Sequence, residues 1–385
     1  MVVTALDETI RVCPQCGFAA GERDHCPGCG THLATLPELP TRAQWLAERS
    51  GTSSPRQAAG RRESGSSPSI RPLLHPTESS RLALAIAAAA LTLGWLLLAL
   101  IGANAANVLP VLLVVVGVVV FFAMTLWFGQ QLHRARLLGQ SVKVAPDSFP
   151  ELHDLVEETK ATLQYHRRVD VYVRDKPGAP IITTSYLGTR TMVIEGDLVA
   201  GLLDDEHRSQ LVFLVGRHVG ALTAKHLRLT FLVLLLHALD ILKFPAPFIL
   251  PWYRATTYSG DQIGMMCCAD ADAALQATRR LLVGKDLAGK MDVGQVLPQV
   301  CLVRARRLPR FAQLFQAEPH VTNRYANLLC FVRYHDPALW ARLKATMQTH
   351  ESRLLDELWE RSPHRKRLAR VGGNTATVAT TRVSA

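Results

Sequence analysis

The sequence predicts a mostly helical α+β domain with a small sheet, preceded by a transmembrane helical hairpin and, at the N-terminus, by a zinc ribbon. Three observations lead to this prediction. Two Cys-Pro-x-Cys-Gly pairs lie within residues 10–35, a run without Lys, Arg, Asp or Glu fills most of residues 81–131, and helical and β-rich segments alternate within residues 147–362. A chain of 385 residues is long enough for two or three such units.

The two cysteine pairs predict a metal site. Cys13 and Cys16 form one knuckle, Cys26 and Cys29 form the other, and nine residues separate them. Four thiolates in two tight turns supply the tetrahedral set that zinc prefers. Disulfides are the alternative, and a reducing compartment disfavours them. We expect one structural zinc per chain and no catalysis there, because four protein ligands leave no open coordination position.

Two segments lack apolar periodicity. Residues 36–80 are rich in Ser, Pro, Gly and Arg, which predicts a disordered linker. Residues 363–385 begin with the basic run PHRKRLAR and continue as a polar tail, which also predicts disorder. Neither segment carries a functional motif.

The uncharged run predicts two membrane spans. It divides into two apolar halves around the short polar sequence ANAAN, and each half has about the 20 residues that cross a bilayer core. A hairpin buried in a soluble domain is the alternative. Basic residues flank the hairpin on both sides and are absent from ANAAN, so the positive-inside rule places both termini in the cytoplasm. The flanking residues are Arg61, Arg62, Arg71, Arg81, Arg134, Arg136 and Lys143.

The net charge of +11 also bears on partners. Because the basic residues concentrate beside the predicted hairpin, we expect them to contact the anionic lipids of the inner leaflet of the cell membrane. Nucleic acid is the alternative partner of a basic chain, and we do not expect it here.

Residues 147–362 read as one folded domain. Three β-rich runs, at 169–175, 180–188 and 191–196, predict a small sheet. Asp204 or Asp205 is expected to cap a long helix that continues to His226. The apolar stretch 229–252 is interrupted by charges and prolines, which favours a membrane-dipping hairpin over a third span. Helices are expected from 256 to 283 and across 294–350.

Five segments, in this order, resemble the HtpX-like membrane zinc metallopeptidase family. They are FPELHDLVEE at 149–158, VYVRDKPGAP at 171–180, MVIEGDLVAGL at 192–202, DDEHRSQLVFLVGRHVGALTAKH at 204–226 and YRATTYSGDQIG at 253–264. The resemblance covers about residues 148–335 and the hairpin before them. It implies a metallopeptidase-like fold with a cytoplasmic groove that holds an extended peptide.

The chain departs from that family at the residues that carry its chemistry. The family's two zinc-binding histidines correspond to Arg217 and Ala221, and its general-base glutamate corresponds to His218. Its third ligand, a glutamate, corresponds to Thr257, whereas Asp261 is retained. Arginine and alanine offer no ligand atom, and zinc hydrolysis also needs a carboxylate to move a proton. We therefore expect no catalytic zinc at these positions.

Three functions follow as expectations. The first is a peptidase-like pseudoenzyme that binds or regulates an unidentified protein or peptide partner. The second is an active membrane zinc metalloendopeptidase of protein quality control, which the family resemblance implies. The third is a structural membrane component that recruits partners through its zinc ribbon. Fold alone does not decide between them.

Two further expectations concern side chains near the motif. With Arg217 at a ligand position, its guanidinium is expected to pair with Asp261 and to supply the positive charge that a metal would give. The alternative is that Arg217 turns to solvent or to the lipid headgroups. His218 and His226 do not rebuild a metal site on one straight helix, since they lie about 12 Å apart along its axis. The remaining cysteines, Cys267, Cys268, Cys301 and Cys330, are expected to be buried apolar side chains.

Overall fold

The computed structural model describes residues 13–14, 39–41, 44 and 70–368, apart from 104–107, 176–178, 187, 205 and 230–245. Most of the predicted linker 36–80 and of the tail 363–385 therefore lies outside the described residues.

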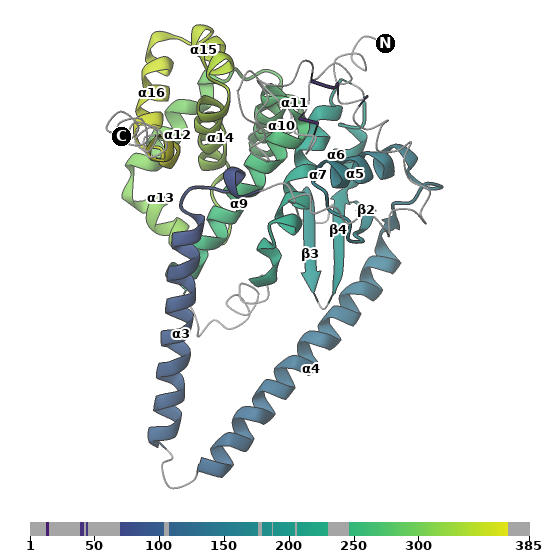
Figure 1. Ribbon diagram of the computed structural model, residues 1–385, viewed down its shortest axis with the longest axis vertical. Helices are drawn as coiled ribbons and strands as arrows, with labels where there is room; N and C mark the ends of the chain where they lie inside the picture. The colour runs from purple at the N-terminus through teal and green to yellow at the C-terminus, as the bar shows by residue number, and fades with distance from the viewer. Residues whose placement is uncertain are drawn as a thin grey trace, which may run out of the picture.

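The described chain is mostly helical and contains one four-stranded sheet (Figure 1). The first part comprises η1 (Arg71–Leu73), α3 (Glu78–Ala103), α4 (Val108–Gln140), β1 (Val142–Lys143), α5 (Pro150–Thr162), β2 (Asp170–Arg174), β3 (Ile181–Tyr186), β4 (Thr189–Glu195), α6 (Gly196–Ala200), α7 (Arg208–Thr223) and η2 (His226–Leu229). The second part comprises α9 (Ala246–Cys268), α10 (Ala271–Val283), α11 (Lys285–Ala288), η4 (Gly294–Val296), α12 (Leu297–Ala305), α13 (Arg307–Ala312), η5 (Gln313–Phe315), α14 (Val321–His335), α15 (Pro337–Ala345) and α16 (Thr349–Glu360).

The strand order of the sheet is β1-β2-β4-β3, with β2 parallel to β4 and β3 antiparallel to it. Alternate residues point to opposite faces. Ile181 and Met192 join the main core, in which α5 and α7 also take part, whereas Ile182 and Val193 pack against Leu137 near the end of α4. The strand β3 therefore forms one edge of the sheet, and both of its faces are covered.

Four glycines allow α7 and α9 to approach closely. A Cβ atom added to Gly220 would lie 2.5 Å from the Cγ2 atom of Ile263, and one added to Gly264 would lie 2.5 Å from the carbonyl oxygen of Phe213. A Cβ atom on Gly216 or Gly260 would also meet the opposite helix, at 2.9 and 3.2 Å. At these glycines no side chain separates the two backbones. Arg217, which follows Gly216 on α7, and Asp261, which follows Gly260 on α9, therefore lie at the contact between the helices.

Several helix boundaries differ from those predicted. The helix α7 begins at Arg208, after His207 at its N-cap position, and ends at Thr223, three residues before His226. The helix α9 begins at Ala246 and includes Pro251. The last residues of the stretch 229–252 are therefore the first turns of a helix of the folded body. Residues 230–245 of that stretch lie outside the described residues.

The prediction of a transmembrane hairpin over 81–131 is wrong. The two halves form α3 and α4, which project from the body and approach each other at their far ends (Figure 1). Large apolar side chains such as Leu91, Trp95 and Phe121 are exposed on them. In the part of the chain that the structure describes, however, no helix is both long and apolar enough to cross a membrane. Part of the run packs on the body instead, where Ala85 is buried against Ile249 and Trp252.

The predicted multi-pass location in the cell membrane, with cytoplasmic termini, is wrong on the same finding. The expected contact of the basic residues with anionic lipid is not tested by this finding and stays a prediction.

The predicted fold class also included a zinc ribbon over residues 10–35, and this part of the prediction is corrected. The described residues contain no group of three or more His, Cys, Asp or Glu side chains that could hold a metal ion. Of the four proposed ligands, Cys13 is described and buried, whereas Cys16, Cys26 and Cys29 lie outside the described residues. The structural zinc at these four cysteines stays a prediction.

Candidate functional site

A cavity of about 160 Å³ opens between the edge strand β3, the helices α7 and α9, and η2. Its lining residues are Ala179, Ile181, Ile182, Thr183, Arg217, His218, Ala221, His226, Leu227, Tyr253, Thr256, Thr257, Gly260 and Glu318. Four of the five residues that the sequence resemblance predicts at the metallopeptidase positions, namely Arg217, His218, Ala221 and Thr257, are among them. The fifth, Asp261, is fully buried beside Gly260. Positions up to 44 residues apart in the sequence thus meet at one site.

The expected ion pair between Arg217 and Asp261 is present. The Nε atom of Arg217 lies 3.2 Å from the Oδ1 atom of Asp261. The carboxylate has a second, unpredicted partner on α14: Arg324 donates from Nε to Oδ2 at 2.8 Å and from Nη2 to Oδ1 at 2.9 Å. One buried carboxylate is therefore held between two guanidinium groups.

The electrostatics of this triad keep both guanidinium groups charged. Burial lowers the pKa of Arg217, and the nearby charge of Arg324 lowers it further, while Asp261 raises it. Burial acts in the same direction on Arg324, but the charge and hydrogen bonds of Asp261 outweigh it and raise its pKa. A guanidinium remains protonated in proteins under either shift. Two positive charges therefore face one buried negative charge, and the exposed Glu318 at the rim supplies a second negative charge.

His218 stands where the metallopeptidase motif has its glutamate. Its Nδ1 atom lies 3.0 Å from the hydroxyl oxygen of Thr183 on β3. Burial, together with the charges of Arg217 and Arg324, holds the pKa of His218 well below its usual value. The imidazole is therefore neutral at pH 7 and links α7 to the edge strand.

The threonines of the site bond to their own helix. Thr256 and Thr257 both donate their hydroxyl groups to the carbonyl oxygen of Tyr253, at 2.7 and 3.4 Å. These contacts leave neither hydroxyl paired with a base, which a nucleophile would require.

The donor set does not fit a catalytic zinc ion. His226 belongs to η2 rather than to α7, and its Nε2 atom lies 2.9 Å from a carboxylate oxygen of Glu78 on α3. The other carboxylate oxygen of Glu78 accepts a hydrogen bond from Ser259. His226 thus holds α3 against the body. No metal-binding group of three or more ligands occurs among the described residues of this site.

Two other polar residues of the segment 253–264, Arg254 and Tyr258, also have structural contacts. Arg254 donates from Nη1 to the carbonyl oxygens of Gln313 and Gln316, both at 2.7 Å, and so fixes η5. The ring of Tyr258 packs against that of His75 with centroids 5.2 Å apart. Cys267, Cys268 and Cys330 are buried, as predicted, whereas Cys301 is only partly buried.

Sequence reasoning missed Arg324, Tyr253 and Glu318. Arg324 lies 63 residues from Asp261 along the chain, so no local spacing connects them. No signal in the sequence pointed to Arg324, because the burial of the neighbouring positions on α14, from Thr322 to Val332, is seen only in the structure.

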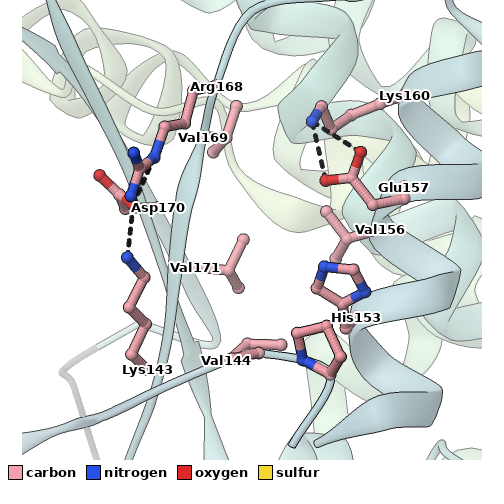
Figure 2. A pocket seen from close by; sticks show the side chains of 12 residues that line it. Lys143, Val144, His153, Val156, Glu157, Lys160, Arg168, Val169, Asp170 and Val171 are labelled. Carbon is pink, nitrogen blue, oxygen red and sulfur yellow. Dashed lines mark hydrogen bonds and ion pairs between the residues drawn. The ribbon is translucent and has the colours of Figure 1, made fainter. Parts of the chain in front are cut away.

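A second hollow, of about 250 Å³, lies between β2 and α5 (Figure 2). Its charged residues neutralise one another. Lys143 and Arg168 converge on Asp170 at 2.9 and 3.2 Å, and Lys160 pairs with Glu157 at 2.8 Å on the helical side. Each cation there already has a carboxylate partner, so the hollow offers no unpaired charge to a ligand.

Scans of the chain against protein-family models, curated proteins and solved structures gave no match.

Proposed function

We propose that this chain is a non-catalytic binding protein that holds an extended peptide segment along β3, in the groove where a metallopeptidase of the HtpX-like family has its active site. The observation that carries the proposal is the triad of Arg217, Asp261 and Arg324, in which Arg217 lines the cavity and pairs with the buried Asp261, and Arg324 pairs with the same carboxylate from α14. A peptidase needs a polarised carbonyl group and an activated water there, whereas this site provides neither.

The edge strand supports a peptide ligand. In the described part of the chain, the sheet ends at β3, and no further strand pairs with its outer edge. An extended peptide binds such an edge through main-chain hydrogen bonds, and pockets for alternate side chains add specificity. Ile181 and Thr183 share the β3 face that lines the cavity, and Ala221 leaves space opposite them on α7.

Filling the cavity tests the proposal. We would measure binding of fluorescein-labelled peptides of about ten residues, in which valine alternates with polar residues to favour the extended form, by fluorescence anisotropy. Ala221→Leu places a larger side chain in the cavity and should weaken binding by about tenfold or more. Ala345→Leu, on the exposed surface of α15, is the matched control and should leave binding unchanged.

The fate of the bound peptide separates the alternatives. Mass spectrometry after prolonged incubation should recover it intact. Cleavage that His218→Ala abolishes would establish the peptidase alternative instead. If none of the peptides binds to the intact chain, the groove is not a peptide site, and the structural role remains.

A further inference from the structure

We propose that the groove selects acidic peptides, because a cationic hollow at the other end of β3 receives their carboxylate side chains. This inference rests on the proposed function and names the class of ligand. The hollow has a volume of about 420 Å³ and lies between the end of α5, the end of α7 and the strands β3 and β4. Arg167, Arg190 and Lys225 line it, and none of its described lining residues is acidic.

These cations lack the carboxylate partners that neutralise the hollow in Figure 2. Among the described residues, Arg167, Arg190 and Lys225 form no ion pair, and Arg190 donates to the carbonyl oxygen of Gly188, at 3.3 Å. Burial raises the pKa of the Tyr165 hydroxyl, and the nearby charges of Arg190 and Arg167 lower it. The positive charges thus gather around one concave surface.

The helix ends around this hollow carry an unusual backbone. Gln164 follows the end of α5 with φ 50°, and Lys225 follows the end of α7 with φ 62°. Glycine is the usual residue at such positions, because a side chain in the left-handed region costs about 1 kcal/mol or more. Both side chains line the hollow. A lysine kept in a strained conformation beside an unpaired arginine is consistent with a binding role.

The hollow and the cavity of the proposed peptide site lie next to each other along β3. Leu227 lines both, Thr183 lines the cavity, and Ser185 lines the hollow. Thr183 and Ser185 point to the same face of the strand, about 6.6 Å apart. A peptide extended beside β3 therefore places side chains two residues apart into the two spaces in turn. The C-terminal end of α7 contributes a partial negative charge of about half a unit. The three full positive charges of Arg167, Arg190 and Lys225 exceed it, so the hollow is cationic.

Two matched probes test the selection by fluorescence anisotropy on the full chain. One is a labelled peptide of about ten residues that alternates threonine and glutamate, and the other replaces every glutamate with glutamine. We expect the glutamate peptide to bind about tenfold more tightly at about 0.05 M salt, and this advantage should disappear at about 0.5 M, because salt screens partly exposed charges. Equal binding of the two peptides at low salt would overturn the inference.

Substitutions locate the effect. The double variant Arg167→Gln and Lys225→Gln should abolish the preference for glutamate and leave the glutamine peptide unaffected. The control, Lys285→Gln with Lys290→Gln, removes the same charge at exposed positions elsewhere and should leave the preference intact. If the control weakens binding equally, net charge alone is responsible and the hollow is not a site. Circular dichroism and the Tm of each variant exclude unfolding.

The failures of the two proposals are distinguishable. If the glutamine peptide binds, and Ala221→Leu abolishes its binding, while glutamate gives no advantage, the peptide groove stands and acidic selection fails. If neither peptide binds, both proposals fail. A single-stranded oligonucleotide of about ten thymidines, tested in parallel, should bind more weakly than the glutamate peptide. Tighter oligonucleotide binding that depends on Arg167 and Lys225 would assign the hollow to nucleic acid and overturn the inference.

Discussion

Arg324 on α14 donates two hydrogen bonds, of 2.8 and 2.9 Å, to the carboxylate of Asp261 on α9. The two residues are 63 positions apart in the sequence. Asp261 is completely buried and Arg324 almost so. The two-point geometry matches the planar guanidinium to the carboxylate, and Arg217 completes the triad from α7 at 3.2 Å. The charge of Arg217, the member of the triad that lines the cavity, is therefore balanced within the protein itself.

Removal of the central carboxylate should destabilise the protein strongly. Asp261→Asn leaves two buried guanidinium groups without a counter-charge, so we expect unfolding to become easier by about 3–5 kcal/mol. Asp356→Asn is the control, because Asp356 pairs with Arg333 and Lys344 but is 44% exposed, and such pairs contribute about 1 kcal/mol or less. Urea unfolding measures both. Equal effects would show that the triad is not a special element of stability.

A methyl group on the contact between α7 and α9 should also destabilise the fold. In Gly264→Ala the new Cβ meets the carbonyl oxygen of Phe213 at 2.5 Å, and backbone cannot yield as a side chain can. We expect a loss of about 1–3 kcal/mol. Gly139→Ala, at a helical position with no atom within 4 Å, should instead stabilise by up to about 1 kcal/mol. A neutral Gly264→Ala would mean that the helices are not in close contact.

Stability should fall with acid because histidines are buried in neutral form. Burial, and to a lesser extent the charge of Arg367, lowers the pKa of His364 to about 3, whereas an unfolded histidine titrates near about 6.5. Between these pH values the unfolded chain binds a proton that the folded chain does not. The contribution of His364 to stability is therefore complete above about pH 6.5 and decreases by about 1.4 kcal/mol per unit as the pH falls toward about 3.

Replacement of this histidine tests the acid effect. His364→Gln should reduce the slope of unfolding free energy against pH in that range, measured by chemical denaturation at several pH values. His350→Gln, at an exposed position, should leave the slope unchanged. An unchanged slope in His364→Gln would show that this imidazole does not control the acid response.

The match to the metallopeptidase motif makes a prediction of its own. Arg217, Ala221 and Thr257 line one cavity, and the first two are four residues apart on one helix, which is the spacing of a two-histidine zinc site. The triple variant Arg217→His, Ala221→His and Thr257→Glu should therefore bind one zinc ion more per chain than the natural sequence. Isothermal titration and metal analysis would show it. The same variant with Thr257→Gln should bind the added ion more weakly, and no gain in zinc would contradict the correspondence of positions.

The sequence by itself determined the local features of this protein. Hydrophobic periodicity and β-branched runs placed the small sheet and the helices that surround it, because these patterns act over a few neighbouring residues. The residue types at 217, 218, 221 and 257 excluded the zinc ligands of the motif, since side-chain chemistry does not depend on the fold. The pairing of Arg217 with Asp261 was also predicted, from two opposite charges at corresponding positions.

Only the tertiary structure decided what surrounds that pair. Arg324, the cavity against β3 and the cationic hollow with Arg167, Arg190 and Lys225 join segments from five parts of the chain, and no sequence spacing encodes such contacts. The prediction of a transmembrane hairpin from the apolar run 82–131 failed for the same reason. An apolar run has the same pattern in the sequence whatever surrounds the helix, and the packing of Ala85 against Ile249 and Trp252 depends on partners remote in the sequence.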